Sequence, residues 1–290
     1  MSQIRINNLT NKTGDSGPTI AGVSTVSTSA FMVMPIGDTA IRGAGSGRML
    51  LMGGFGNAPS ATYKTQIQRL TIASTGNSID FGDMSVARYV PGTCASSTRG
   101  IAAGGENPSP GTDTIDYITI SSSGGANDFG NLRTATTFQV GLSDSTRGLI
   151  AGGYVAPLDI SSIDFVTIAT TGNSNIFGNL TEKKRHCAAC ASPTRGIIMG
   201  GNTLNTIEFV TIATGGNGTD FGDLAKGAGW IGSGASSTRG VFAGGYSGGG
   251  VNRIEYVTIA TTGDAQDFGD LVGPAVYGCG GLSDVHGGLG

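Results

Sequence analysis

The sequence predicts an all-β protein assembled from repeated units, and three observations lead to this fold class. Glycine makes up 52 of the 290 residues, about 18%, against about 7% in average proteins. Charged residues are sparse at 13%, while hydrophobic residues reach 38%, enough to form a core. One unit of 44 to 51 residues recurs five times along the chain. Short strands joined by many tight turns account for all three observations.

Composition also excludes several classes of function. The net charge of −3 argues against a nucleic-acid-binding surface. The longest apolar run, Phe31–Ile36, is far shorter than the roughly 18 residues of a membrane helix, so we expect no membrane insertion. The first residues lack the basic start and apolar stretch of a secretory signal, so we expect synthesis in a cytoplasm. The four cysteines are too few for a disulfide scaffold.

Two markers define the repeat. A Gly-Gly pair follows an apolar run, and a Phe-Gly-Asp or Phe-Gly-Asn unit comes later in each copy. The pairs begin at Gly53, Gly104, Gly152, Gly200 and Gly244, and the phenylalanines are Phe81, Phe129, Phe177, Phe221 and Phe268. The distance from each phenylalanine to the next basic turn residue is 18 in every copy. Length therefore varies only between the Gly-Gly pair and the following isoleucine, at 55–66, 106–114, 154–162, 202–206 and 246–253.

Each copy predicts four strands. The apolar run that ends at Gly200 predicts a buried strand, and the β-branched and aromatic run Ile254–Ile259 predicts a second. Asp267–Leu271 is typical of a third, and the Gly/Ala/Ser-rich segment before each Arg-Gly turn is the fourth. Four strands repeated five times indicate a five-bladed β-propeller with four-stranded blades. The blades are expected at about 48–98, 99–146, 147–194, 195–238 and 239–290.

Closure of the ring requires a strand from one end of the chain. Val276–Asp284 matches the first strand of a blade but has no second strand after it. We expect it to complete the first blade, because the 18-residue spacing is kept there and closure removes free sheet edges. In the alternative register, Ile41–Ser46 supplies that strand.

The repeat resembles known families. The double glycine, the aromatic of the third strand and the bulky aromatic of the fourth are similar to the kelch repeat. Three sequence segments of the repeat resemble virion proteins of marine tailed bacteriophages: Ser-Thr-Arg-Gly, Tyr-Val-Thr-Ile-Ala-Thr-Thr-Gly-Asn and Asp-Phe-Gly-Asp-Leu. Residues 1–47 resemble the N-terminal attachment segments of phage tail and fibre proteins. The resemblance implies an extended arm that docks onto other virion proteins, with apolar contacts from Ile4, Ile6, Leu9, Ile20 and Val23.

Because strand directions alternate, all length variation falls on one face of the propeller, which we call the variable face. Two sets of residues are expected there. The first residues after the Gly-Gly pairs are Phe55, Glu106, Tyr154, Asn202 and Tyr246; the residues nine before each basic turn residue are Val90, Phe138, His186, Trp230 and Tyr277. Aromatic rings beside amides and carboxylates can stack on sugars and bind their hydroxyls. The alternative is that these side chains pack between blades or fill the mouth of the channel.

The opposite face is expected to carry a ring of turn arginines: Arg48, Arg99, Arg147, Arg195 and Arg239. They could bind an acidic partner. The favoured interpretation is structural or solvated arginines. Asp83, Asp223 and Asp270, with Asn131 and Asn179, recur equally often and could pair with them. His186, Cys187 and Cys190 invite a zinc interpretation, but residues 187 and 190 of one strand point to opposite faces, so no metal and no cofactor are expected.

The leading hypothesis is a phage structural protein located in the virion. Its arm would dock it to the particle, and its propeller would bind the host surface, with a glycan as the favoured ligand over a protein. The alternatives are a protein–protein interaction scaffold, or capsid decoration without receptor binding; homo-oligomer formation is left open. A glycan-active enzyme is not expected, because two histidines and few charges provide no acid–base pair.

Overall fold

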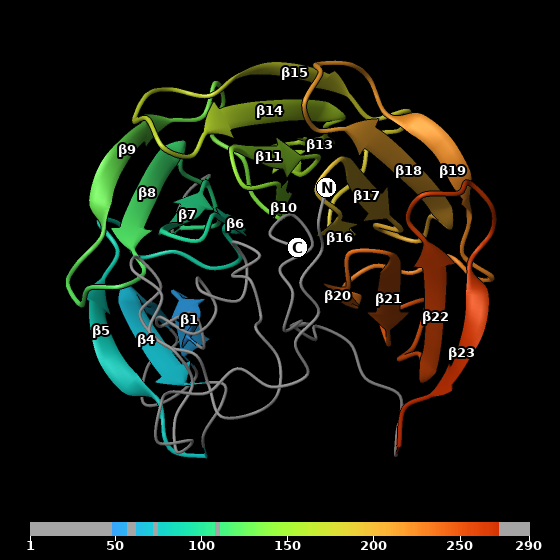
Figure 1. The fold of residues 1–290 in the computed structure, drawn as a ribbon, viewed down its shortest axis with the longest axis horizontal. Coiled ribbons are helices and arrows are strands. Elements are labelled where there is room, and N and C mark those ends of the chain that lie inside the picture. The colour runs from blue at the N-terminus through green and yellow to red at the C-terminus, as the bar shows by residue number, and fades with distance from the viewer. Residues whose placement is uncertain (1–47, 57–61, 72–74, 108–110, 273–290) are drawn as a thin grey trace, which may run out of the picture. The chain divides into compact units, whose positions relative to one another are not determined.

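The protein is a five-bladed β-propeller. The computed structural model describes residues 48–56, 62–71, 75–107 and 111–272, all within a compact unit that spans Gly45–Gly290. Every regular element in these ranges is a β-strand, and no helix there could cross a membrane. Figure 1 shows five sheets that follow one another around a common centre, which confirms the predicted fold class.

Four sheets have four antiparallel strands, and the first has three among the described residues. The innermost strands are β6 (Gly92–Ala95), β10 (Val140–Ser143), β16 (Ala188–Ala191) and β20 (Gly232–Ala235). The second strands are β1 (Arg48–Met52), β7 (Arg99–Ala103), β11 (Arg147–Ala151), β17 (Arg195–Met199) and β21 (Arg239–Ala243). The third strands are β4 (Gln66–Thr71), β8 (Thr114–Thr119), β14 (Ser162–Thr167), β18 (Thr206–Thr211) and β22 (Arg253–Thr258). The outer strands are β5 (Ile79–Asp83), β9 (Asn127–Asn131), β15 (Asn175–Asn179), β19 (Thr219–Asp223) and β23 (Gln266–Asp270).

Two of the variable-length segments form small hairpins of their own. The first pairs β2 (Phe55–Gly56) with β3 (Thr62–Tyr63), and the second pairs β12 (Tyr154–Val155) with β13 (Leu158–Asp159). Both follow a Gly-Gly pair, whose positive φ angles turn the chain out of the second strand of the blade. The hairpins extend the variable face beyond the ends of the main strands.

The hydrophobic core lies between the blades. One buried cluster combines Ile101, Ile115 and Phe129 of the second blade with Ile150 and Val166 of the third, and other clusters join the later blades in the same way. The predicted apolar positions of the repeat thus face the neighbouring blade. Burial of this surface at about 25 cal/mol per Å² holds the blades together.

A glycine contact repeats between the outer edges of neighbouring blades. A Cβ added at Gly130, whose φ is 143°, would lie 2.5 Å from the carbonyl oxygen of Gly172 in the next blade. The backbone N–H of Gly172 donates to the carbonyl of Phe129 at 2.7 Å. Equivalent contacts occur between the other consecutive blades, from the first to the fifth. The Phe-Gly marker therefore records a close backbone approach between blades.

The predicted closure cannot be followed in the described residues. Val276–Asp284, Ile41–Ser46 and the predicted arm at 1–47 all lie outside them. In the described part of the first blade, β1 pairs with β4, and no strand occupies its inner edge.

Candidate functional site

One backbone position of the repeat adopts a conformation that side chains rarely tolerate. Val90, Phe138, His186 and Trp230 have φ angles of 46°, 57°, 58° and 59°. Each lies two residues before the innermost strand of its blade. This left-handed conformation costs about 1–2 kcal/mol for a residue other than glycine. Its recurrence in four blades shows that the turn itself belongs to the repeat, whatever side chain it carries.

Backbone hydrogen bonds link these turns around the axis. The N–H of His186 donates to the carbonyl of Phe138 at 3.1 Å, and the N–H of Trp230 donates to the carbonyl of His186 at 2.9 Å. The inner strands that follow, β10, β16 and β20, contact one another in the same order. The strained turns therefore bring three side chains from three blades to one place at the centre of the propeller.

These three side chains, Phe138, His186 and Trp230, form what we call the axial cluster. The imidazole of His186 stacks on the indole of Trp230 with ring centroids 3.8 Å apart. The Phe138 ring meets His186 edge-on at 4.6 Å and Trp230 at 5.8 Å. All three are half-buried. The three rings thus pack against one another across blades and each keeps part of its surface exposed.

His186 is held neutral in this cluster. Burial and, to a smaller extent, the neighbouring Arg185 charge lower its pKa to about 4, against the opposing effect of Asp159. Its Nε2 atom is shielded from solvent and has no hydrogen-bond partner. The imidazole therefore acts as an aromatic ring rather than as a cation or a base at neutral pH.

A second group of side chains, which we call the Arg185 group, surrounds Arg185 next to the axial cluster. The guanidinium lies over the ring of Tyr154 at 4.5 Å and at 6.0 Å from that of Phe138. Its Nε is 3.5 Å from Oδ1 of Asp159, and Nδ2 of Asn202 donates to Oδ2 of Asp159 at 2.8 Å. The group consists of Tyr154, Asp159, Arg185 and Asn202, contributed by two adjacent blades.

Local structure explains how these residues meet. Tyr154 and Asp159 pair with each other in the hairpin β12–β13. Asn202, with a φ of 53°, donates its backbone N–H to the carbonyl of Arg185 at 3.0 Å. Asparagine tolerates this left-handed conformation better than most residues. The residue after the Gly-Gly pair is therefore fixed beside the strained turn of its own blade.

The backbone contact between the residue after the Gly-Gly pair and the residue before the strained turn recurs in the second, third and fifth blades. Tyr89 bridges Glu106, Thr137 bridges Tyr154, and Gly229 bridges Tyr246. Phe55 lies in the hairpin of the first blade and contacts Tyr63 at 5.3 Å and Tyr89 at 6.3 Å. Phe55 and Tyr246 are 45% and 43% exposed. The structure thus brings Phe138, Tyr154, His186, Asn202 and Trp230 together. Phe55 lies apart in the first blade, Tyr246 pairs with Gly229 beside Trp230 in the fifth, and Tyr277 lies outside the described residues.

The turn arginines of the opposite face bind backbone carbonyls. Arg99 donates through one terminal nitrogen to the carbonyls of Ile168 and Ala169 in the next blade, at 3.1 and 2.9 Å, and lies 4.5 Å above the ring of Tyr117. Arg195 repeats this arrangement with the carbonyls of Ile259 and Ala260, and Arg147 donates to the single carbonyl of Ile212. Both lie over a phenylalanine ring, and Arg239 lies over Tyr256. Among the described residues, none of these four arginines forms an ion pair or a hydrogen bond with Asp83, Asp223 or Asp270, so the suggested pairing is wrong for them. The side chain of Arg48 lies outside the described residues.

The structure also contains buried polar sites between blades that sequence reasoning missed. An acidic residue follows the isoleucine at the bulge of the third strand in four blades, namely Asp116, Asp164, Glu208 and Glu255. Each lies against the segment that enters from the preceding blade, and we call each such place an inter-blade polar site. The signal was present in the sequence as a recurring Ile-Asp or Ile-Glu pair.

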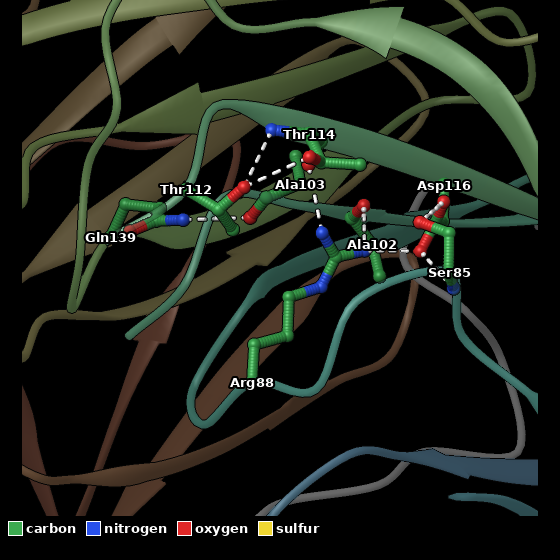
Figure 2. A network of polar contacts seen from close by, with 8 residues as sticks. All are labelled: Ser85, Arg88, Ala102, Ala103, Thr112, Thr114, Asp116 and Gln139. Atoms are coloured by element: carbon green, nitrogen blue, oxygen red, sulfur yellow. Dashed lines mark hydrogen bonds and ion pairs between the residues drawn. The ribbon is translucent and has the colours of Figure 1, made fainter. Parts of the chain in front are cut away.

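Figure 2 shows the first of these sites, between the first and second blades. The side chains of Arg88 and Asp116 are both fully buried, and an Nη of Arg88 lies 2.8 Å from the carboxylate. The guanidinium also donates to the carbonyls of Ala102 and Thr114, at 3.2 and 3.0 Å. Ser85 donates to Asp116 through its backbone N–H and its hydroxyl. Burial lowers the pKa of Arg88, and the Asp116 charge opposes this shift. The ion pair and the surrounding hydrogen bonds join the two blades.

The repeat position of Arg88 holds a cation at only one other described inter-blade polar site. Among the described residues, Lys184 takes the place of Arg88 and lies 2.6 Å from Glu208. Thr136 and Ala228 occupy this position at the sites of Asp164 and Glu255, where cavities of about 20 and 10 Å³ remain. There Arg133 and Arg253 reach the carboxylates from more exposed positions, at 3.3 and 3.1 Å. The acid is constant in these four blades, while the source of its counter-ion changes.

The three described cysteines show no arrangement for metal binding. The thiol of Cys187 lies beside Gly201 of its own blade, whereas that of Cys190 lies beside Gly240 of the next blade. Burial raises the pKa of both thiols, and that of Cys94, to about 12. Within the part of the chain that the structure describes, no three His, Cys, Asp or Glu side chains converge on one point.

No protein-family model matches the chain, and no curated protein is significantly similar to it. The site is therefore interpreted from its geometry. Five of its residues follow from the repeat spacing, but Asp159 and Arg185 do not. Their only signals were the position of Asp159 in a variable-length segment and of Arg185 at the end of the basic run that begins at Lys183.

Proposed function

We propose that this propeller is a non-catalytic binding module that recognises a glycan through its variable face. The observation that carries the proposal is the convergence of the axial cluster with the Arg185 group. Partly exposed aromatic rings, an amide and a guanidinium lie together on one surface, and this combination suits the apolar faces and hydroxyls of sugars. The exposed rings of Phe55 in the first blade and Tyr246 in the fifth add further aromatic surface on the same face.

Several features support binding rather than catalysis. His186 has a pKa of about 4 and a shielded Nε2, so it cannot serve as a general base near neutral pH. The three described thiols have pKa values of about 12 and are poor nucleophiles. Asp159, the carboxylate at the centre of the Arg185 group, is already engaged on both oxygens by Arg185 and Asn202.

We further propose that the protein belongs to a phage virion. The support is the resemblance of its repeats to kelch-like units in virion proteins of marine tailed phages, and of residues 1–47 to attachment segments. In this proposal the N-terminal arm docks onto other virion proteins, and the variable face is displayed toward the host surface.

Two measurements test the proposal with the full chain. Purified protein is applied to a glycan array, first as wild type and then as Tyr154→Ala and Trp230→Ala variants. Ile176→Ala serves as the control, since Ile176 is 67% exposed on the outer strand β15. We expect binding to a restricted set of saccharides, at least about tenfold weaker in either aromatic variant and unchanged in the control.

Immunogold labelling of purified phage particles then tests the location. Label at tail or fibre tips supports receptor engagement, and label scattered over the capsid favours decoration. Absence of label from the particles would overturn the virion assignment and favour a protein–protein scaffold. Absence of binding on the array would overturn glycan recognition.

A further inference from the structure

Arg185 is fixed at the variable face by its neighbours. Its guanidinium rests on the Tyr154 ring, and its Nε faces the Asp159 carboxylate. Its own backbone carbonyl accepts the N–H of Asn202. These contacts come from two adjacent blades, so the side chain is positioned before any ligand arrives. A positioned arginine loses little conformational entropy on binding.

The outer edge of this guanidinium remains unused. Nε is shielded from solvent and has no hydrogen-bond partner, only the ion pair with Asp159 at 3.5 Å. The side chain as a whole is 33% exposed, and neither terminal nitrogen forms a hydrogen bond to a described residue. The turn arginines differ, because Arg99 and Arg195 each direct a terminal nitrogen to two carbonyls. Arg88 differs as well, since three acceptors surround its buried head. Arg185 thus presents free donors within the candidate site.

Asp159 orients this arginine without occupying its outer edge. One carboxylate oxygen faces Nε of Arg185, and the other accepts from Asn202. Oδ1 is held by the ion pair at 3.5 Å without a hydrogen bond, whereas Oδ2 is hydrogen-bonded. The paired terminal nitrogens of a guanidinium match the two oxygens of a carboxylate in a planar, bidentate contact, which a lysine cannot reproduce.

We infer that the Arg185 group is a subsite for the carboxylate of an acidic sugar. The inference rests on the proposed glycan-binding function and specifies its ligand class. Arg185 binds the carboxylate, the exposed part of the Tyr154 ring lies beneath the sugar, and the Asn202 side chain provides an amide oxygen for a neighbouring hydroxyl. The axial cluster next to it contributes further ring surface.

The test compares saccharides that differ only in the carboxylate. Calorimetric titration of the full chain uses oligogalacturonate against its methyl ester, and sialyl-lactose against lactose, with sulfated and phosphorylated sugars as a further arm. Arg185→Gln and Arg185→Lys remove the charge and the planar fork, respectively. Arg133→Gln is the matched control, because Arg133 is also ion-paired through Nε and is similarly exposed, at 36%, outside the Arg185 group.

We expect wild type to prefer at least one carboxylated saccharide over its neutral counterpart. Loss of a charge-assisted hydrogen bond should weaken this binding about 10- to 100-fold in Arg185→Gln, and a similar loss is expected in Arg185→Lys. Arg133→Gln should bind as wild type does. An unchanged thermal midpoint separates loss of binding from loss of folding.

The failures are distinguishable. Binding restricted to neutral saccharides, or to sulfated or phosphorylated ones, overturns the carboxylate subsite and leaves glycan recognition intact. Equal losses in Arg185→Gln and Arg133→Gln overturn the assignment to Arg185. If no saccharide binds on the array or in these titrations, the inference and the proposed function both fall.

Discussion

At the scale of single residues, His186 shows how burial changes the protonation of an ionisable ring. It lies between an indole and a phenyl ring, and both its stacking and its neutral state depend on burial. In the unfolded chain the same imidazole has a pKa near 6.5. Folding therefore excludes a proton that the unfolded chain accepts readily.

This difference predicts acid sensitivity with a defined sign. The folded pKa of about 4 lies below the unfolded value, so the unfolded state binds more protons between the two. The contribution of His186 to stability is complete above about pH 6.5 and is lost as the pH falls toward 4. Thermal unfolding midpoints measured from pH 8 to pH 4 should decline in this interval.

His186→Phe isolates this contribution because it keeps an aromatic ring and removes the titration. The variant should show a flatter profile than wild type between pH 6.5 and 4, with both curves parallel above pH 7. The other ionisable groups are the same in both proteins, so their effects cancel in the comparison. Identical slopes in the two proteins would contradict a depressed pKa at His186.

At the scale of strands and sheets, the sequence was sufficient to predict every blade. Gly-Gly pairs, β-branched runs and Phe-Gly units mark strand ends directly, and their constant spacing fixes which strands are equivalent. The inter-blade polar sites could not be predicted in the same way. Arg88 and Asp116 are 28 positions apart and lie in different blades, and the counter-ion moves from one place in the repeat to another.

The buried pair of Arg88 and Asp116 should behave as a unit. Arg88→Met leaves the Asp116 charge buried without its cation, which should lower the free energy of unfolding by about 3–5 kcal/mol. Arg88→Met combined with Asp116→Leu removes both charges and should recover most of this loss. Urea unfolding of the two single variants, the double variant and wild type measures the coupling.

Arg133→Met provides the comparison at a more exposed ion pair. Its partner Asp164 keeps the hydroxyl of Ser174, and Arg133 itself is 36% exposed, so the expected loss is below about 1 kcal/mol. Similar losses in the free energy of unfolding for Arg88→Met and Arg133→Met would show that burial does not determine how much an ion pair contributes to stability.

At the scale of the whole molecule, the number of blades and their order around the axis were predicted correctly, whereas closure stays a prediction. The strained turns at the axis were not foreseen either. Their positive φ angles occur at valine, phenylalanine, histidine and tryptophan, residue types that give no local signal for this conformation. Contacts between blades impose it, so composition and spacing place these residues near the axis without revealing their backbone.

Closure by the C-terminal segment can be tested by truncation of the full chain. β1 has no inner partner among the described residues, and Leu51 on this strand is 42% exposed. Removal of residues 276–290 should lower the unfolding midpoint by about 10 °C or more and promote association through the open edge. Removal of residues 1–46 should leave the midpoint nearly unchanged. The reverse pattern would assign closure to Ile41–Ser46.

The turns at Val90, Phe138, His186 and Trp230 have a consequence for how this surface can change over generations. The same backbone conformation carries an aliphatic side chain, a hydrocarbon ring, an imidazole and an indole. The left-handed backbone is unfavourable for any residue other than glycine, so replacing one of these side chains by another changes this conformational free energy little. Single substitutions at these positions can therefore alter what the propeller presents at its axis while the blades stay intact. Under the proposed function, single substitutions at these turns would adapt the binding surface to a changed host glycan without altering the fold.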